Sequence, residues 1–209
     1  MPLNWLFTEP LFFLSWILAI LVTLTIHEFF HALAANLLGD STAKDEGRLN
    51  FNPLVHLDPL GFIMMLIAGF GWAKPVPVNP YNLRGGRWGT AAVAFAGPLA
   101  NLLGMFIFAV LFKMISPALG PMNLLVNFLF LLVLINISLF VFNLIPIPPL
   151  DGSRVLLAVI PDKFSDFKEK YLMYGPYILL ALVLIDNFTN VGIFGSLFQR
   201  LINILSRFL

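Results

Sequence analysis

The sequence predicts an all-α polytopic membrane protein, a bundle of about four to six helices with a re-entrant segment and a membrane-associated β-hairpin. Composition is the first reason. Hydrophobic residues make up 59% of the 209 residues and charged residues 11%, whereas soluble chains are about 45–50% apolar and about 25% charged. The second reason is that long apolar runs recur, and the third is that clustered prolines interrupt the segments between them. We expect one membrane-embedded domain over residues 1–209.

Four segments are predicted to cross the bilayer, because about 20 consecutive apolar residues suffice for a helical span. They cover residues 11–38, 91–112, 123–145 and 172–185, and the last is the shortest. Residues 60–72 are apolar but too few to span, which favours a re-entrant segment.

Residues 71–80 are predicted to be extended. Three prolines in this stretch exclude a helix, and Val76 and Val78 alternate with them. This alternation favours a strand or β-hairpin with an open edge.

The tail, residues 191–209, has an amphipathic pattern. One helical face carries Gln199, Arg200, Asn203, Ser206 and Arg207, and the other carries Phe194, Leu197, Phe198, Leu201, Leu205 and Phe208. Such a helix either lies at the membrane interface or packs at the edge of the bundle.

The basic residues predict the orientation. If the first span runs from outside to inside, nearly all of them lie on the cytoplasmic side, and Lys113 is the clear exception. This agrees with the positive-inside rule. We therefore expect a multi-pass protein of the cell membrane whose first span ends in the cytoplasm.

Charge and cysteine content exclude several functions. The net charge of +1 gives no basic field for nucleic acid. Because cysteine is absent, disulfides and thiolate metal ligands are excluded. The sequence does not indicate an oligomeric state.

His27, Glu28 and His31 form an H-E-x-x-H motif near the cytoplasmic end of the first span. Residues four apart share a helix face, so both imidazoles can bind one ion. Glu28 points partly aside, where it can hold a metal-activated water and take its proton as general base. Two helical histidines that only make hydrogen bonds are the alternative. We favour the metal, because the span carries no other charge and such residues are costly in a bilayer.

Asp151 is the best candidate for a third ligand. Catalytic zinc usually has three protein ligands and one open position, and Asp151 follows the prolines that break the third span. Its alternative role is an N-cap for the next helix. His56 is the rival ligand, although a turn histidine bonded to the backbone is the favoured reading of it.

Two asparagines stand in otherwise apolar spans. Asn143 is either a donor to substrate backbone or to an oxyanion, or a helix-end hydrogen-bonding group, and the residues alone do not decide between these roles. For Asn101, which follows Gly97 and Pro98, we favour interhelical packing.

Together these motifs resemble the site-2 protease family of intramembrane zinc metalloproteases, in its short prokaryotic form without PDZ or CBS modules. The matching motifs are residues 27–31, the segment from Gly97 to Asn101, and Asn143 to Gly152. The resemblance extends over residues 20–160. It implies one Zn²⁺ held by His27, His31 and Asp151.

The resemblance also implies the remaining roles. Glu28 would be the catalytic base, and Asn143 would contact the substrate. The segment containing Val76 and Val78 would pair with an unwound strand of a membrane-protein substrate. The expected reaction is hydrolysis of peptide bonds in or near transmembrane helices, at an active site in the cytoplasmic half of the bilayer.

Two other functions compete with this one. A transporter or metal-handling protein could use histidines and carboxylates as an ion path, but the other spans lack charged residues to continue it. A silent scaffold that binds a partner's membrane helix is the third possibility, and it is disfavoured because the motif lacks nothing essential.

Overall fold

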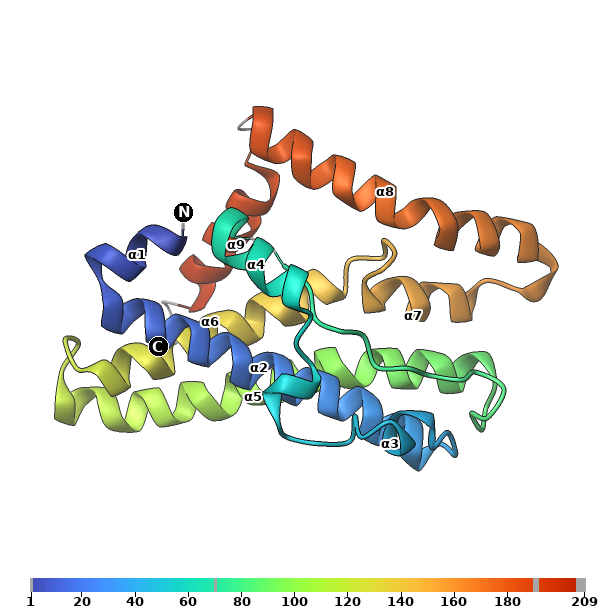
Figure 1. Cartoon of the computed structure of the whole chain (residues 1–209), viewed down its shortest axis with the longest axis horizontal. Coiled ribbons are helices and arrows are strands. Elements are labelled where there is room, and N and C mark those ends of the chain that lie inside the picture. Colours follow the sequence, from blue (N-terminus) through green and yellow to red (C-terminus); the bar gives the residue numbers. More distant parts are fainter. Residues whose placement is uncertain (1, 70, 190–191, 206–209) are drawn as a thin grey trace.

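The computed structural model describes residues 2–69, 71–189 and 192–205. Within them lie nine α-helices, two short 3₁₀ helices and no sheet (Figure 1). The elements are α1 (Pro2–Thr8), α2 (Pro10–Leu37), α3 (Thr42–Asp45), η1 (Pro53–Val55), α4 (Pro59–Ala68), α5 (Arg87–Leu119), α6 (Leu124–Asn143), α7 (Asp151–Val159), η2 (Asp162–Phe164), α8 (Ser165–Thr189) and α9 (Ile193–Leu205). The expected four to six helices were too few, because short helices also form between and beside the spans.

Three of the described helices, α2, α5 and α6, are long and apolar enough to cross a membrane. They pack against one another (Figure 1), and part of the core between them is formed by Ala19, Leu129, Leu131 and Leu132. The predicted fourth span, 172–185, lies inside α8, which is not one of these three. The apolar helices indicate a membrane protein.

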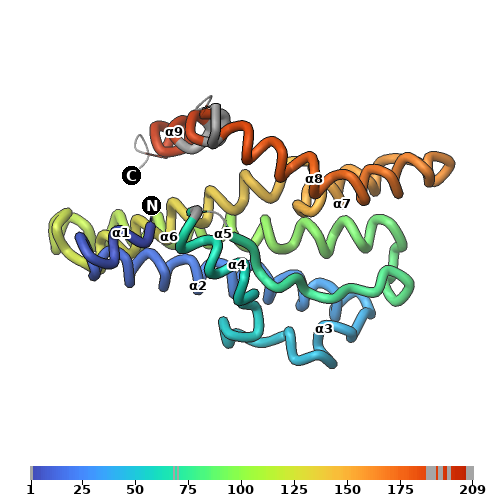
Figure 2. Tube along the Cα trace, turned by 45° about the horizontal axis from the view of Figure 1, so that its top comes forward, coloured from blue at the N-terminus to red at the C-terminus, as the bar shows by residue number. Residues whose placement is uncertain are grey.

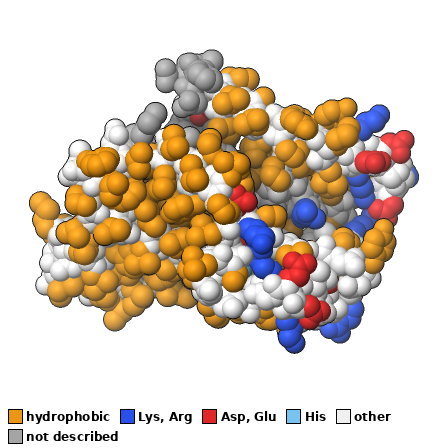
Figure 3. All heavy atoms as spheres, viewed as in Figure 1, with side chains coloured by type: hydrophobic (Ala, Val, Ile, Leu, Met, Phe, Trp, Pro, Cys, Tyr) orange, Lys and Arg blue, Asp and Glu red, His pale blue; other side chains and the backbone are white. Residues whose placement is uncertain are grey.

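Hydrophobic and charged side chains gather at opposite ends of the molecular surface. In Figure 3, hydrophobic side chains cover the end of the molecule where α1 and the first half of α2 lie. Charged side chains gather toward the opposite end, where α3 and the start of α8 lie. Such a division is expected when one end of a bundle faces water and the rest faces lipid.

The predicted β-hairpin at residues 71–80 is wrong. The only pairing in this segment is an isolated antiparallel bridge between Leu57 and Ala73, beside which the Lys74 N–H donates to the His56 carbonyl at 2.9 Å. Pro75 and Pro77 have no N–H to continue a ladder. The segment therefore runs as an extended chain without a paired strand.

Asp40 ties this extended segment to the end of α2. Its buried carboxylate accepts hydrogen bonds from the Asn79 N–H at 2.7 Å and from Asn82 Nδ2 at 3.2 Å. Burial alone would raise the pKa of the Asp40 carboxyl, but hydrogen bonds from Thr42, Asn79 and Asn82 outweigh it and hold the pKa below its usual value. The tether is therefore ionised at neutral pH.

The chain turns sharply between α6 and α7, as its prolines predict. In Figure 2, α8 lies beside this turn and continues toward α9. The Tyr171 hydroxyl on α8 donates to the Pro146 carbonyl, and a Cβ at Gly175 would come within 2.4 Å of Pro148. Close contact with α8 thus fixes the turn that delivers Asp151.

Part of the predicted amphipathic tail forms the C-terminal helix. Helix α9 (Ile193–Leu205) packs against α6. Residues 191 and 206–209 of that prediction lie outside the described residues. The re-entrant prediction at 60–72 falls largely on α4, which begins after the N-cap Asp58 and is followed by the C-cap Gly69 with φ of 74°.

Candidate metal centre

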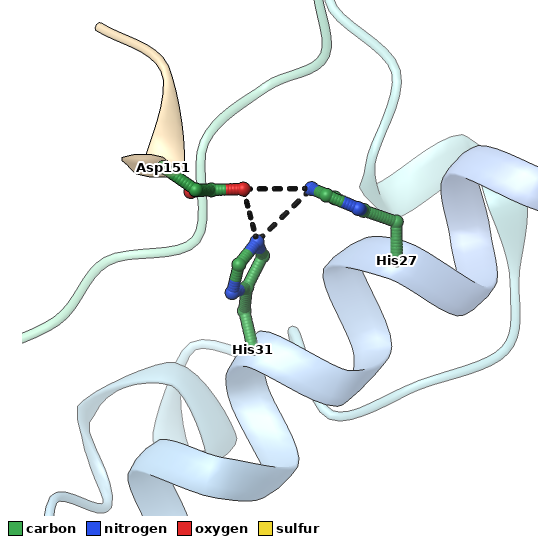
Figure 4. Close-up of side chains that lie close together, drawn as sticks. All are labelled: His27, His31 and Asp151. Atoms are coloured by element: carbon green, nitrogen blue, oxygen red, sulfur yellow. Dashed lines mark hydrogen bonds and ion pairs between the residues drawn. The ribbon is translucent and has the colours of Figure 1, made fainter. Parts of the chain in front are cut away.

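Three potential metal ligands converge between α2 and the start of α7. His27 and His31 lie one turn apart on α2, and their Nε2 atoms are 3.0 Å from each other. Asp151 points toward both, with its Oδ2 atom 3.2 Å from each Nε2 (Figure 4). Both imidazoles are buried and the carboxylate is partly buried. Among the described residues this is the group of His, Asp and Glu side chains that could hold a metal ion.

Asp151 is not an N-cap, the alternative role that its position allowed. The N-cap of α7 is Leu150, and no side chain caps this helix end. The Asp151 Oδ2 atom is buried and has no hydrogen-bond donor among the described residues. Its orientation is therefore not explained by local helix chemistry.

The hydrogen-bond partner of Nδ1 in each imidazole shows which of the two ring nitrogens carries the proton. His27 Nδ1 lies 2.6 Å from Asn101 Oδ1, and His31 Nδ1 lies 2.7 Å from the Val93 carbonyl oxygen. Both partners are acceptors, so each Nδ1 carries a proton, and in a neutral imidazole Nε2 then has a free lone pair.

The centre consequently holds three acceptor atoms that face one another. A second proton on each ring would place two imidazolium ions side by side, with Nε2 atoms 3.0 Å apart. That arrangement is unfavourable in a buried site. One divalent cation satisfies all three lone pairs at once, and neutral imidazole and carboxylate are ordinary zinc ligands. The residues present therefore fit a zinc ion.

Gly97 allows α5 to approach the two histidines closely. A Cβ at this position would lie 2.3 Å from His31 Nε2 and 2.7 Å from His27 Cε1. From the sequence, Gly97 was singled out as part of a packing motif and of the family resemblance, but this contact with the histidines was not predicted.

Asn101 is more than the packing residue that the sequence favoured. It is fully buried, contacts His27 directly, and is joined by the equally buried Asn136 and Thr23. Asn136 and Thr23 were not singled out from the sequence. The available signal was the cost of burying a polar side chain in an apolar span.

A cavity of about 420 Å³ opens beside the three ligand atoms. The predicted site residues on its wall are His27, Glu28, His31, Val76, Val78, Asn143 and Asp151. Asn143 uses one Nδ2 hydrogen for the Leu139 carbonyl of its own helix at 3.1 Å. The site residues predicted from four separate segments thus share one cavity.

His56 lies apart from this group. It is buried, its Nε2 atom lies 2.9 Å from the Asn50 carbonyl oxygen, and it does not line the cavity. The backbone-bonded turn histidine, which the sequence favoured, is the arrangement found.

Comparison with known proteins identifies the family. Over 171 residues the chain is 37% identical to "Putative zinc metalloprotease YwhC" of Bacillus subtilis (strain 168), which covers 79% of this chain and 78% of that protein. A model of peptidase family M50 matches residues 114–184. The chain belongs to peptidase family M50. This is the site-2 protease family that the motifs resemble.

Two further relatives carry similar names. The chain is 33% identical over 130 residues to "Putative zinc metalloprotease MJ0611" of Methanocaldococcus jannaschii, covering 62% of each. It is 34% identical over 146 residues to "Putative zinc metalloprotease Rip2" of Mycolicibacterium smegmatis, covering 65% of this chain and 53% of that protein. No solved structure matches. The M50 model match includes Asn143 and Asp151 but begins after the histidines on α2, so the grouping of these histidines with Asp151 rests on the geometry.

Proposed function

We propose that this chain is an intramembrane zinc metalloprotease that hydrolyses peptide bonds in or near the transmembrane segments of membrane-protein substrates. The observation that carries the proposal is the convergence of two Nε2 lone pairs and an unpartnered carboxylate oxygen on a cavity that Glu28 also lines. Membership of peptidase family M50 supports it. Residues 1–209 would form a single membrane-embedded metalloprotease domain.

One zinc ion per chain would be held by His27, His31 and Asp151. When bound, zinc acts as a Lewis acid on a scissile carbonyl and makes a neighbouring water acidic enough to attack it. Zinc is favoured over other divalent ions by the two imidazole ligands and by the family.

Glu28 would move the protons of the reaction. Its position next to His27 turns its side chain away from the ligand plane, and it lines the cavity. The carboxylate takes a proton from the attacking water and delivers it to the leaving amine. Asn143 would donate from Nδ2 to the substrate carbonyl as negative charge develops there.

The extended segment at 71–80 would hold the substrate. A transmembrane helix resists cleavage because its carbonyls are hydrogen-bonded internally, so it must unwind locally. Val76 and Val78 line the cavity, and none of the described residues accepts a hydrogen bond from either backbone N–H. These free donors can pair with an unwound strand even though the segment forms no hairpin of its own.

The site would lie in the cytoplasmic half of the cell membrane. The charged end of the bundle supports this orientation, because the basic residues concentrate there. His27 and His31 occupy the half of α2 nearer that end. Water would reach them through the polar loops on the same side.

Reconstitution tests the activity directly. The purified protein in lipid vesicles should cleave a transmembrane-helix peptide. Chelation should abolish cleavage, and Zn²⁺ but not Mg²⁺ should restore it. Cleavage that persists after complete removal of the metal would rule out this mechanism, and a zinc-loaded protein that cuts no membrane helix would rule out the proposed substrate class.

Val76→Pro should raise the KM for a membrane-helix substrate by about fivefold, because a lost backbone hydrogen bond is worth about 1 kcal/mol. The measurement is cleavage at varied peptide density in vesicles. Val76→Ala is the matched control, since it shortens the side chain but keeps the N–H. Equal KM values for the two variants would show that the substrate does not pair with this segment.

A further inference from the structure

Three fully buried polar side chains lie between the spanning helices, next to the metal centre. Thr23 comes from α2, Asn101 from α5 and Asn136 from α6, and each is 0% exposed. Asn136 sits against Gly104 of α5, where an added Cβ would lie 2.7 Å from its Oδ1 atom. The amide of Asn136 thus occupies the contact between two spans.

Each hydrogen bond in this group fixes the orientation of the next side chain, and the first is fixed by the Leu132 backbone carbonyl. The Leu132 carbonyl can only accept, so the Asn136 atom 2.8 Å away must be the donor Nδ2. Asn136 Nδ2 also donates to Thr23 Oγ1 at 3.2 Å. The Oδ1 atom of Asn136 consequently faces Asn101.

The direction continues to the metal centre. Asn136 Oδ1 accepts from Asn101 Nδ2 at 3.2 Å, which leaves Asn101 Oδ1 facing His27. Because Oδ1 can only accept, His27 Nδ1, 2.6 Å away, must carry the proton. The proton on Nδ1 leaves the Nε2 lone pair pointing toward Asp151.

We propose that Asn136 is a positioning residue that fixes the tautomer and ring orientation of His27 through Asn101. The inference rests on the proposed metal site. Asn101 Nδ2 also donates to the Thr23 backbone carbonyl, but at 3.5 Å, which is longer than its 3.2 Å bond to Asn136. Without Asn136, this longer bond alone opposes a half-turn of the Asn101 amide that would present Nδ2 to His27. His27 Nδ1 then becomes an acceptor, and the proton moves to Nε2, where it blocks the metal.

His31 differs from His27 in this respect. Its Nδ1 atom lies 2.7 Å from the Val93 carbonyl, a backbone group that cannot rotate to offer a donor. The tautomer of His31 therefore needs no side-chain support. The effect of Asn136 is therefore expected at His27 and not at His31.

Asn136→Leu tests the inference, with Asn127→Leu, an exposed position on the same helix, as the matched control. Outer partners of metal-bound histidines typically change metal affinity about 10–100-fold, so we expect zinc affinity to fall about tenfold in Asn136→Leu and to stay unchanged in the control. Gly104→Ala, which displaces the Asn136 amide without removing it, should act in the same direction. It also serves as the second variant if Asn136→Leu fails to fold.

Nitrogen NMR of protein labelled at its three histidines measures the tautomer without metal. Metal-free wild type should show His27 protonated at Nδ1, whereas Asn136→Leu should show a mixture of tautomers. The Nδ1–H form of His31 should persist in both. The NMR measurement does not require zinc binding. It therefore tests the role of Asn136 even if the proposed metal site is wrong, and the two failures can be told apart.

A second substitution separates positioning from packing. Asn101→Asp presents an acceptor oxygen to His27 in either orientation of its carboxylate, so loss of Asn136 cannot turn a donor toward His27 and Asn136→Leu should not lower zinc affinity in that background. If Asn136→Leu lowers zinc affinity equally in both backgrounds, or leaves both the His27 tautomer and the affinity unchanged, the inference is overturned.

Discussion

Glu28→Gln should lower the rate of peptide cleavage by about 10²–10⁴-fold, the usual contribution of a general base. Glutamine has nearly the same shape but cannot accept the proton of the attacking water at neutral pH. The zinc content should stay at the wild-type value, because Glu28 lies beside the ligand atoms without belonging to the group that could hold the ion. The measurements are initial cleavage rates in vesicles and metal analysis of the same preparation.

The control for this prediction is a carboxylate that does not line the cavity. Glu9→Gln changes an exposed carboxylate that precedes α2, and it should leave cleavage and zinc content unaltered. A Glu28→Gln protein that cuts as fast as the wild type would contradict the mechanism. A protein that loses its zinc would indicate that Glu28 is itself a ligand.

Gly97→Ala should remove most of the bound zinc and with it the activity. A Cβ 2.3 Å from His31 Nε2 cannot be accommodated without moving α5 away from α2 or rotating the imidazole. Either response separates the ligand atoms, and a catalytic geometry displaced by about 1 Å can lose about 100-fold in rate. Zinc stoichiometry after dialysis against weak chelator is the measurement.

Gly195→Ala serves as the matched control, since it is a helix glycine whose added Cβ would meet nothing within 4 Å. It should retain wild-type zinc and cleavage. A Gly97→Ala protein with full zinc content and full activity would show that the approach of α5 to the two histidines is not as close as the geometry requires.

Features that local periodicity decides could be predicted from the sequence. The spacing of His27 and His31 places both on one face of α2, because residues four apart meet on a helix. The prolines after Asn143 predict that α6 ends there. Both features are determined by neighbouring residues in the sequence, so they could be predicted without knowing how the helices pack.

Contacts between helices were beyond the reach of the sequence. The relay from Asn136 through Asn101 to His27 depends on the register of α6 against α5 and of α5 against α2. Local pattern does not encode that register. For the same reason the contact of Gly97 with His27 and His31 could not be predicted, because it depends on how α5 packs against α2.

The prediction of a β-hairpin was wrong for a different reason. Alternating Val and Pro at residues 75–78 resembles the period of a strand, but an antiparallel ladder needs N–H groups on both chains. Proline lacks them. A strand-like pattern therefore produced an extended segment with one isolated bridge.

Zinc analysis combined with zinc-edge X-ray absorption on the purified protein tests the central claim most directly. We expect about one zinc per chain, bound only by nitrogen and oxygen at about 2.0–2.2 Å. The histidine contribution to the spectrum should disappear together with the metal in His31→Ala. A wild-type protein without stoichiometric metal, or a His31→Ala protein that keeps its zinc with an unchanged spectrum, would contradict the assignment of His27, His31 and Asp151 as the metal centre.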